Sequence, residues 1–149
     1  PGPAGARARR AVIAYVESSV VLRFVLAQAG ALRELRGFDA GGTSALTEVE
    51  CLRTLDRLRI SDGLADLQIA ERRAAVYDLL GRLGIIDLTR PVLERASQPL
   101  PIALGTLDAL HLASALAWRE HLAQPVVLAT HDARLGAAAR ALGLETVGT

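Results

Sequence analysis

Short apolar runs alternate with helical segments along this chain, and that alternation restricts the fold more than any other feature. The first run, residues 11–16, is rich in β-branched residues, and further short runs follow at residues 43–46, 85–88 and 126–129. These runs lack the strict apolar–polar alternation of strands that are exposed on one face. The pattern therefore predicts an α/β fold in which helices cover both faces of a mainly parallel sheet.

Helical periodicity and cap residues fill the intervals between these runs. In the long segment 62–83, apolar residues recur at three- and four-residue spacing, which predicts that they form its buried face. These residues are Leu64, Leu67, Ala70, Ala74, Tyr77 and Leu80. We also expect Tyr15 and Phe24 in the core. Further helices are predicted over residues 20–26, 30–37, 47–59, 91–96, 106–119 and 133–142, and a last edge strand over 145–147.

The composition fits one domain with a large core. The chain has 149 residues, 51% of them hydrophobic, and a mean hydropathy of +0.29, which excludes a disordered chain. Residues 1–10 are rich in proline, glycine, alanine and arginine, and we expect a flexible basic arm or the scar of an expression tag there. The single domain is then expected over residues 11–149.

Charge and cysteine content exclude several classes of mechanism. All 17 basic residues are arginine, so a Walker-type phosphate loop or a Schiff base, which need a lysine, is excluded. The net charge of +1 gives no general attraction to nucleic acid, so any basic patch must be local. Cys51 is the one cysteine, which excludes an internal disulfide and a cysteine-rich zinc site and fits a reduced, cytoplasmic compartment. No apolar run approaches the roughly 20 residues of a membrane span.

Four acidic residues stand at junctions between strands and helices. Glu17 follows the first strand, Glu50 and Asp108 lie in the first turns of two helices, and Asp132 precedes the last helix. Each one taken alone fits a structural role. Residues 47–50 form a T-x-x-E capping box, and Thr106 and Asp132 fit as N-caps.

Taken together, the four acids point to a metal site. Because strand-to-helix junctions of a parallel sheet meet at its carboxyl edge, we expect the four carboxylates to face one crevice. Like charges at such distances repel and raise each other's pKa, and a divalent cation removes the conflict. Mg²⁺ or Mn²⁺ takes oxygen ligands and keeps some of its waters. Such a site suits hydrolysis of a phosphodiester, since the metal activates water and stabilises charge on phosphate.

Four segments carry a family resemblance and follow one another in that family's order and spacing. They are AYVESSVVLRFVL at 14–26, TSALTEVECLRTL at 43–55, TLDALHLASALA at 106–117 and VVLATHDARLGAAARALGL at 126–144. With them the chain resembles PIN-domain proteins of the VapC toxin type. The resemblance implies a compact three-layer α/β/α sandwich and a metal-dependent endoribonuclease that is the toxin of a toxin–antitoxin pair. It further implies a homodimer and a VapB-type antitoxin that inserts near the active site.

The resemblance also assigns roles to residues of this chain. It makes Asp108 a metal-binding aspartate, with Glu50 and Asp132 completing the acidic cluster and Thr130 supporting it by holding a water or a carboxylate. Glu17 stands where the family normally has aspartate, and it would be the third metal ligand beside Asp108 and Asp132. Its side chain is one methylene longer, and an error of ~1 Å in position can cost ~10²-fold in rate.

RNA binding would need positive charge around this acidic centre. Arg23, Arg53, Arg57 and Arg134 are candidates for phosphate contacts, and the alternative is that they are ordinary surface arginines. The family cuts transfer RNA or ribosomal RNA loops, and the sequence does not choose between them. His111 fits as a buried helix residue or as one that orients Asp108, and His131 as one placed to touch the substrate. The histidine spacing does not favour a zinc site.

Two other classes of function stay open at this point. In the first, Glu17 weakens the metal site and leaves a module that binds RNA or an antitoxin without cutting. The second class is a small phosphatase or another α/β hydrolase. It would need an aspartyl nucleophile in a D-x-D turn, which the residues 17–19, Glu-Ser-Ser, do not supply.

Overall fold

The computed structural model describes residues 9–31 and 33–149, and its centre is a five-stranded sheet. The strand order is β3-β2-β1-β4-β5, and each of the four strand pairings is parallel. The parallel sheet expected from the sequence is therefore confirmed. The expected arm over residues 1–10 lies mostly outside the described residues, although Arg9 forms an ion pair with Asp39 at 2.7 Å.

The elements follow the expected alternation of strands and helices, with one 3₁₀ helix, η1. Their bounds are β1 Ile13–Val16, α1 Ser18–Val25, η1 Arg33–Gly37, β2 Ala40–Ser44, α2 Leu46–Asp62, α3 Asp66–Leu80, β3 Gly84–Ile86, α4 Arg90–Ala96, α5 Thr106–Leu122, β4 Val127–Ala129, α6 Ala133–Ala141 and β5 Glu145–Val147. Within the described part of the chain, no helix is long and apolar enough to cross a membrane.

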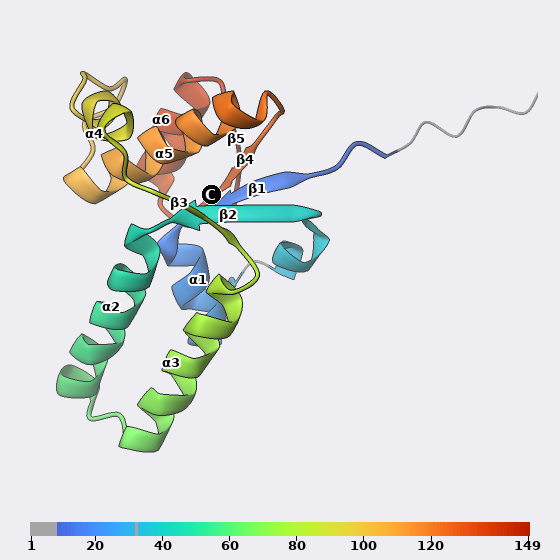
Figure 1. The fold of residues 1–149 in the computed structure, drawn as a ribbon. Helices are drawn as coiled ribbons and strands as arrows, with labels where there is room; N and C mark the ends of the chain where they lie inside the picture. The colour runs from blue at the N-terminus through green and yellow to red at the C-terminus, as the bar shows by residue number, and fades with distance from the viewer. Residues whose placement is uncertain (1–8, 32) are drawn as a thin grey trace, which may run out of the picture.

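Helices cover both faces of the sheet, so the fold is a three-layer α/β/α sandwich. Figure 1 shows α1, α2 and α3 on one side and α4, α5 and α6 on the other. The strand β1 serves both layers, because successive side chains of a strand point to opposite faces. Ala14 and Val16 pack in one buried cluster and Tyr15 packs in the other. A central strand buried on both sides is what an apolar run without alternation predicts.

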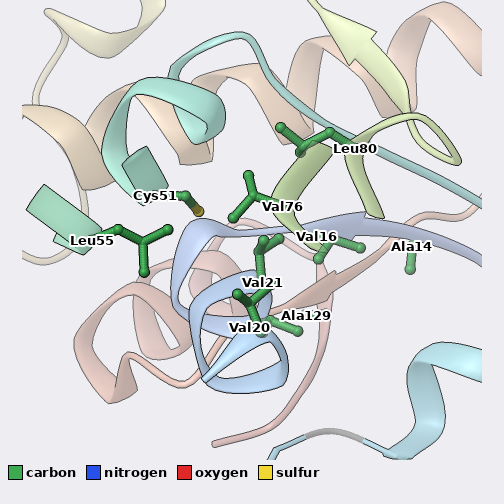
Figure 2. Close-up of a cluster of buried hydrophobic side chains, with 10 residues drawn as sticks. Ala14, Val16, Val20, Val21, Cys51, Leu55, Val76, Leu80 and Ala129 are labelled. Carbon is green, nitrogen blue, oxygen red and sulfur yellow. The ribbon is translucent and has the colours of Figure 1, made fainter. Parts of the chain in front are cut away.

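The first of these clusters anchors the two helices that follow β1 and β2 (Figure 2). Val20 and Val21 of α1 and Leu55 of α2 have no exposed surface, and they pack together against β1. Full burial of each such side chain contributes about 1.5–3 kcal/mol. This packing fixes the beginnings of α1 and α2 at the carboxyl edge of the sheet, where Glu17 and Glu50 lie.

The strand β2 is less apolar than the sequence pattern predicted. It contains two glycines, and the packing of a neighbouring side chain explains one of them. Its sequence is AGGTS, and a Cβ atom on Gly42 would lie 2.8 Å from the ring of Trp118. Only glycine allows α5 to approach β2 this closely.

The predicted buried face of α3 is wrong. Leu67 and Tyr77 are 71% and 48% exposed, and Ala70 and Ala74 are exposed as well. The buried residues are instead Ile69, Val76 and Leu80, of which only Leu80 was expected. The face was misassigned because packing against α1 and α2 selects one of several apolar stripes on this helix, and the spacing alone does not choose among them.

Two further details differ from expectation. Phe24 is 39% exposed and is not a core residue, whereas Tyr15 is fully buried as predicted. The break between α2 and α3 falls at residues 63–65, so Asp62 ends α2 and does not begin α3. Gly63 has φ of +62°, a conformation that favours glycine and ends α2.

Candidate active site

The four predicted acids come from four elements that end or begin at the carboxyl edge of the sheet. Glu17 directly follows β1, and Asp132 lies between the neighbouring strand β4 and α6. Glu50 lies in the second turn of α2 and Asp108 in the first turn of α5. One ligand atom each from Glu17, Glu50 and His111 lie within 4.8 Å of one another. The structure thus forms an acidic cluster, with a histidine in it that the sequence did not predict as a ligand.

Glu17 is buried, and its carboxylate caps α1. Its Oε1 accepts hydrogen bonds from the Ser19 backbone N–H at 3.0 Å and the Ser18 hydroxyl at 2.5 Å. Its Oε2 accepts from the Ser19 hydroxyl and from the Thr130 hydroxyl, the latter at 3.0 Å. A carboxylate offers about four acceptor positions. The longer side chain of Glu17 is therefore folded back onto the start of α1 and held by donors from α1 and from the segment after β4.

Asp132 is the N-cap of α6, as the sequence predicted. Its Oδ1 accepts a hydrogen bond from the Leu135 backbone N–H at 2.8 Å. Its own backbone N–H donates to the Thr130 hydroxyl at 3.0 Å, and Thr130 donates in turn to Glu17. Thr130 has no exposed surface and links the two acidic residues.

The other predicted caps are wrong. The helix α2 begins at Leu46, so Thr47 lies inside it and pairs its hydroxyl with Thr43 at 2.7 Å. The capping box over residues 47–50 therefore does not form. The Glu50 side chain makes no cap and instead contacts His111 in the acidic cluster. For α5 the N-cap is Gly105, and Thr106 is its first residue. This start places Asp108 in the first turn, where the helix dipole favours a negative charge.

Glu50 is held by two partners from different elements. Its Oε2 lies 3.2 Å from the Ser18 hydroxyl, whose one proton it shares with Glu17, and its Oε1 lies 2.5 Å from Nε2 of His111. His111 is completely buried, and its Nδ1 lies 2.8 Å from the Tyr15 hydroxyl. His111 is thus a buried helix residue, which was one of the two sequence-based interpretations. Its hydrogen bond goes to Glu50 of α2, across 61 residues of sequence, and no hydrogen bond joins it to Asp108 among the described residues.

The charges in the site act on Asp108. Burial, followed by the negative charges of Asp132 and Glu17, raises the pKa of the Asp108 carboxyl above its usual range. Among the described residues, Glu17, Glu50 and His111 form a tight group that does not include Asp108. The negative charges of all three other acids nevertheless contribute to the raised pKa of Asp108. Clustered carboxylate oxygens that raise one another's pKa are the ligand set that a hard divalent cation stabilises. The residues present therefore fit Mg²⁺ or Mn²⁺.

Cys51 follows Glu50 in the sequence but has no chemical role in this site. It lies in the apolar cluster of Figure 2 and has no exposed surface. Burial, then the charges of Glu50 and Glu17, raise the pKa of its thiol to about 12. The thiol stays protonated at neutral pH, which excludes thiolate catalysis at this edge.

The arginines predicted to contact substrate occupy different positions. Arg134 lies in the first turn of α6, beside Asp132, and donates to the Ala103 carbonyl at 2.6 Å. Arg53 is exposed on α2 and pairs with Asp56 at 3.5 Å, and Arg57 donates to the Thr54 hydroxyl at 2.8 Å. Arg23 lies in the last turn of α1, at the opposite end of that helix from Glu17. Arg134 and Arg53 thus lie within three residues of Asp132 and Glu50 in the chain, whereas Arg23 lies at the far end of α1 from Glu17.

Sequence reasoning missed several polar partners of the cluster. Ser18, Ser19 and Tyr15 each contact a charged group or His111, and the backbone N–H of His131 donates to the Ser19 hydroxyl at 3.0 Å. The signal for the serines was present, because serine is common at the start of a helix. No local signal pointed to the pair of Tyr15 and His111, which are 96 residues apart in the sequence.

Comparison with known proteins agrees with this architecture. A family model described as PIN domain matches residues 14–141, which is most of the chain. The chain belongs to the PIN domain family. It is 32% identical over 136 residues to Ribonuclease VapC46 of Mycobacterium tuberculosis, and the match covers 89% of this chain and 95% of that protein. The resemblance drawn from the four sequence segments is therefore confirmed.

Two solved structures share the fold. FitAcB from Neisseria gonorrhoeae superposes with a TM-score of 0.63 at 16% identity, over 91% of this chain and 96% of that chain. A toxin–antitoxin complex from Klebsiella pneumoniae gives 0.61 at 17% identity, over 83% of this chain and 90% of that chain. At these identities the likeness establishes the PIN-like sandwich.

Proposed function

We propose that this chain is the toxin of a toxin–antitoxin pair, an endoribonuclease that hydrolyses RNA phosphodiester bonds with Mg²⁺ or Mn²⁺. The observation that supports it is the convergence of four carboxylates on one edge of the sheet, where burial and then the negative charges of Asp132 and Glu17 raise the pKa of Asp108. The similarity to a VapC ribonuclease over most of both chains points the same way.

In this proposal Asp108, Asp132 and Glu17 hold the metal, and Glu50 completes the cluster and directs the attacking water. A bound divalent ion lowers the pKa of a water and stabilises negative charge on the phosphate. The chain's own residues keep the ligands in place: Thr130 ties Glu17 to the backbone of Asp132, and His111 holds Glu50.

Arginines beside the cluster would bind the RNA. Arg134 and Arg53 lie on the helices that carry Asp132 and Glu50, and their guanidinium groups suit phosphate. The RNA is a loop of transfer RNA or ribosomal RNA in the cytoplasm. A VapB-type antitoxin would block the cluster with an arginine that pairs with the carboxylates. Residues 11–149 would act as one domain within a homodimer.

The test of this proposal is cleavage of total cellular RNA by the purified protein in Mg²⁺, Mn²⁺ or EDTA, beside the variant Asp108→Asn. We expect discrete fragments that need the metal and disappear in the variant. A thermal melt of the variant serves as the control for folding. Full cleavage by Asp108→Asn, or cleavage in EDTA, would show that the proposed mechanism is wrong.

The second candidate is a PIN module that binds RNA or an antitoxin but cuts weakly, and the contacts of Glu17 favour it. All the acceptor positions of that carboxylate face protein donors, so a metal must displace at least one of them. In this case the chain as given binds metal weakly, and Glu17→Asp, which shortens the side chain, restores both metal binding and cleavage. If Glu17→Asp cuts no faster than the original chain, this candidate is rejected.

A further inference from the structure

His111 is unusual among the histidines of this chain, because it is buried completely and both of its ring nitrogens have a partner. Nε2 lies 2.5 Å from Oε1 of Glu50, and Nδ1 lies 2.8 Å from the Tyr15 hydroxyl. The ring of Tyr15 meets that of His111 edge to face, with centroids 6.0 Å apart and an angle of 75°. Tyr15 is also fully buried, so neither ring can turn without disturbing the core.

The chemistry of the partners assigns the protons. A carboxylate can only accept a hydrogen bond, so Nε2 of His111 carries a proton and donates it to Glu50. When the ring carries this one proton, Nδ1 is the acceptor, and the Tyr15 hydroxyl donates to it. Burial raises the pKa of Tyr15 well above its usual range, so that hydroxyl keeps its proton and remains a donor. The chain of donors runs from β1 through α5 to α2 and ends on Glu50.

We infer that His111 is a positioning residue that fixes the Glu50 carboxylate at the metal site, and that Tyr15 fixes the His111 ring. This inference rests on the proposed metal-dependent function. Glu50 comes from a helix on one side of the sheet, and His111 comes from a helix on the other side (Figure 1). The contact between them therefore links the two helices that supply Glu50 and Asp108.

Direct metal binding by His111 is the competing interpretation, because Nε2 lies within reach of Glu17 and Glu50. It would require Nε2 to lose its proton and its hydrogen bond to Glu50. Mg²⁺ and Mn²⁺ prefer oxygen ligands, and carboxylates that bind metals are commonly held by hydrogen bonds from neighbouring side chains. The geometry of His111 matches such a neighbour, since its donor points at a carboxylate oxygen.

A matched pair of variants tests whether His111 acts through its hydrogen bond to Glu50 or only through the volume that it fills. His111→Gln keeps an N–H donor near the position of Nε2, whereas His111→Leu fills a similar volume without a donor. We expect His111→Leu to bind Mn²⁺ about 10- to 100-fold more weakly by calorimetry without RNA, and His111→Gln to keep most of the affinity. Tyr15→Phe should show a smaller loss. The control is His121→Leu, which changes an exposed histidine on the same helix and should leave Mn²⁺ binding unchanged.

Nitrogen NMR of the histidine rings gives a readout that does not depend on activity or on the stability of His111→Leu. We expect His111 to carry its proton on Nε2 in the metal-free protein and to keep it there when Mg²⁺ is added. A proton on Nδ1 with none on Nε2, or loss of the Nε2 proton on adding Mg²⁺, would overturn the inference. Equal loss of Mn²⁺ binding in His111→Gln and His111→Leu would do the same.

The same measurements give a different result if the proposed metal-dependent function itself is wrong. In that case the original chain itself binds no Mn²⁺ and cuts no RNA, and the positioning role is rejected together with the metal site. If the original chain binds Mn²⁺ and cuts RNA while a folded His111→Leu does so equally well, only the role of His111 is rejected.

Discussion

Glu17 and Asp132 occupy equivalent places after two neighbouring strands, and both cap a helix. They differ in how many hydrogen-bond donors surround the carboxylate, and this difference decides how easily each can bind a ligand. Each follows a parallel strand and caps the next helix, Glu17 after β1 and Asp132 after β4. Glu17 is 4% exposed and accepts hydrogen bonds from four donors. Asp132 is half-buried, and among the described residues its carboxylate accepts from Leu135 alone. A metal ion must therefore displace one of the donors of Glu17, whereas one oxygen of Asp132 has no protein donor among the described residues.

Thr130 connects the two caps and explains why they differ. Its hydroxyl donates to Glu17 and accepts from the backbone N–H of Asp132, so it adds a partner to one carboxylate and none to the other. The comparison therefore predicts that changes at Asp132 act on activity, whereas changes at Glu17 act first on stability.

The largest effect is expected from Asp132→Asn. Asparagine caps helices about as well as aspartate, so stability should change by no more than about 0.5 kcal/mol. Loss of the charge should lower RNA cleavage by about 100-fold or more, because removing even an indirect partner of a metal typically costs about 10- to 100-fold. Cleavage assays and thermal melts of the same preparation check both parts. Cleavage close to that of the original chain would show that Asp132 is only a cap.

Glu17→Gln tests the other half of the comparison. The amide nitrogen cannot accept a hydrogen bond, so it would face donors from Ser18, Ser19 or Thr130 in a buried site. We expect a loss of about 2 kcal/mol in the free energy of unfolding, measured in urea without metal. Glu48→Gln is the matched control, because Glu48 is exposed in the first turn of α2. Equal stability of the two variants would contradict the capping role of Glu17.

Thr130→Val removes the connecting hydroxyl while keeping a branched side chain of similar size. The hydroxyl donates to a carboxylate and is fully buried, so its loss should cost about 1.5 kcal/mol of stability. Thr130→Ser keeps the hydroxyl and should lose less. If valine is as stable as serine at this position, the hydroxyl does not link the two caps.

The smallest effect concerns the pH dependence of the metal-free protein. The raised pKa of Asp108 means that folding stability from this group is present at low pH and is lost as the pH rises through the raised value. Asp108→Asn carries no such charge, so in EDTA it should be more stable than the original chain at pH 7. The advantage should shrink toward pH 3, where Asp108 is protonated in both the folded and the unfolded state. A difference that is independent of pH would argue against a raised pKa of Asp108 in the folded protein.

The sequence by itself determined the class of the fold and the places of Glu17 and Asp132 between a strand and a helix. Apolar runs and helical periodicity are local patterns, so they predicted the parallel sheet, the last strand over residues 145–147 and the positions of Glu17 and Asp132 at strand ends. The four family segments added the PIN-domain membership that the family model confirms. Local patterns suffice for these features because each depends on residues that are close in the chain.

Only the tertiary structure decided which side chains meet. Which face of α3 is buried depends on how α1 and α2 pack against it. Whether the Glu50 side chain can reach the acidic cluster depends on the residue at which α2 begins. The contacts of His111 with Tyr15 and Glu50, and of Thr130 with Glu17, join residues 61 to 113 positions apart. Such pairs follow from the order of the strands and the side of the sheet on which each helix packs. These are properties of the assembled core, because burial energy is gained only when the layers come together.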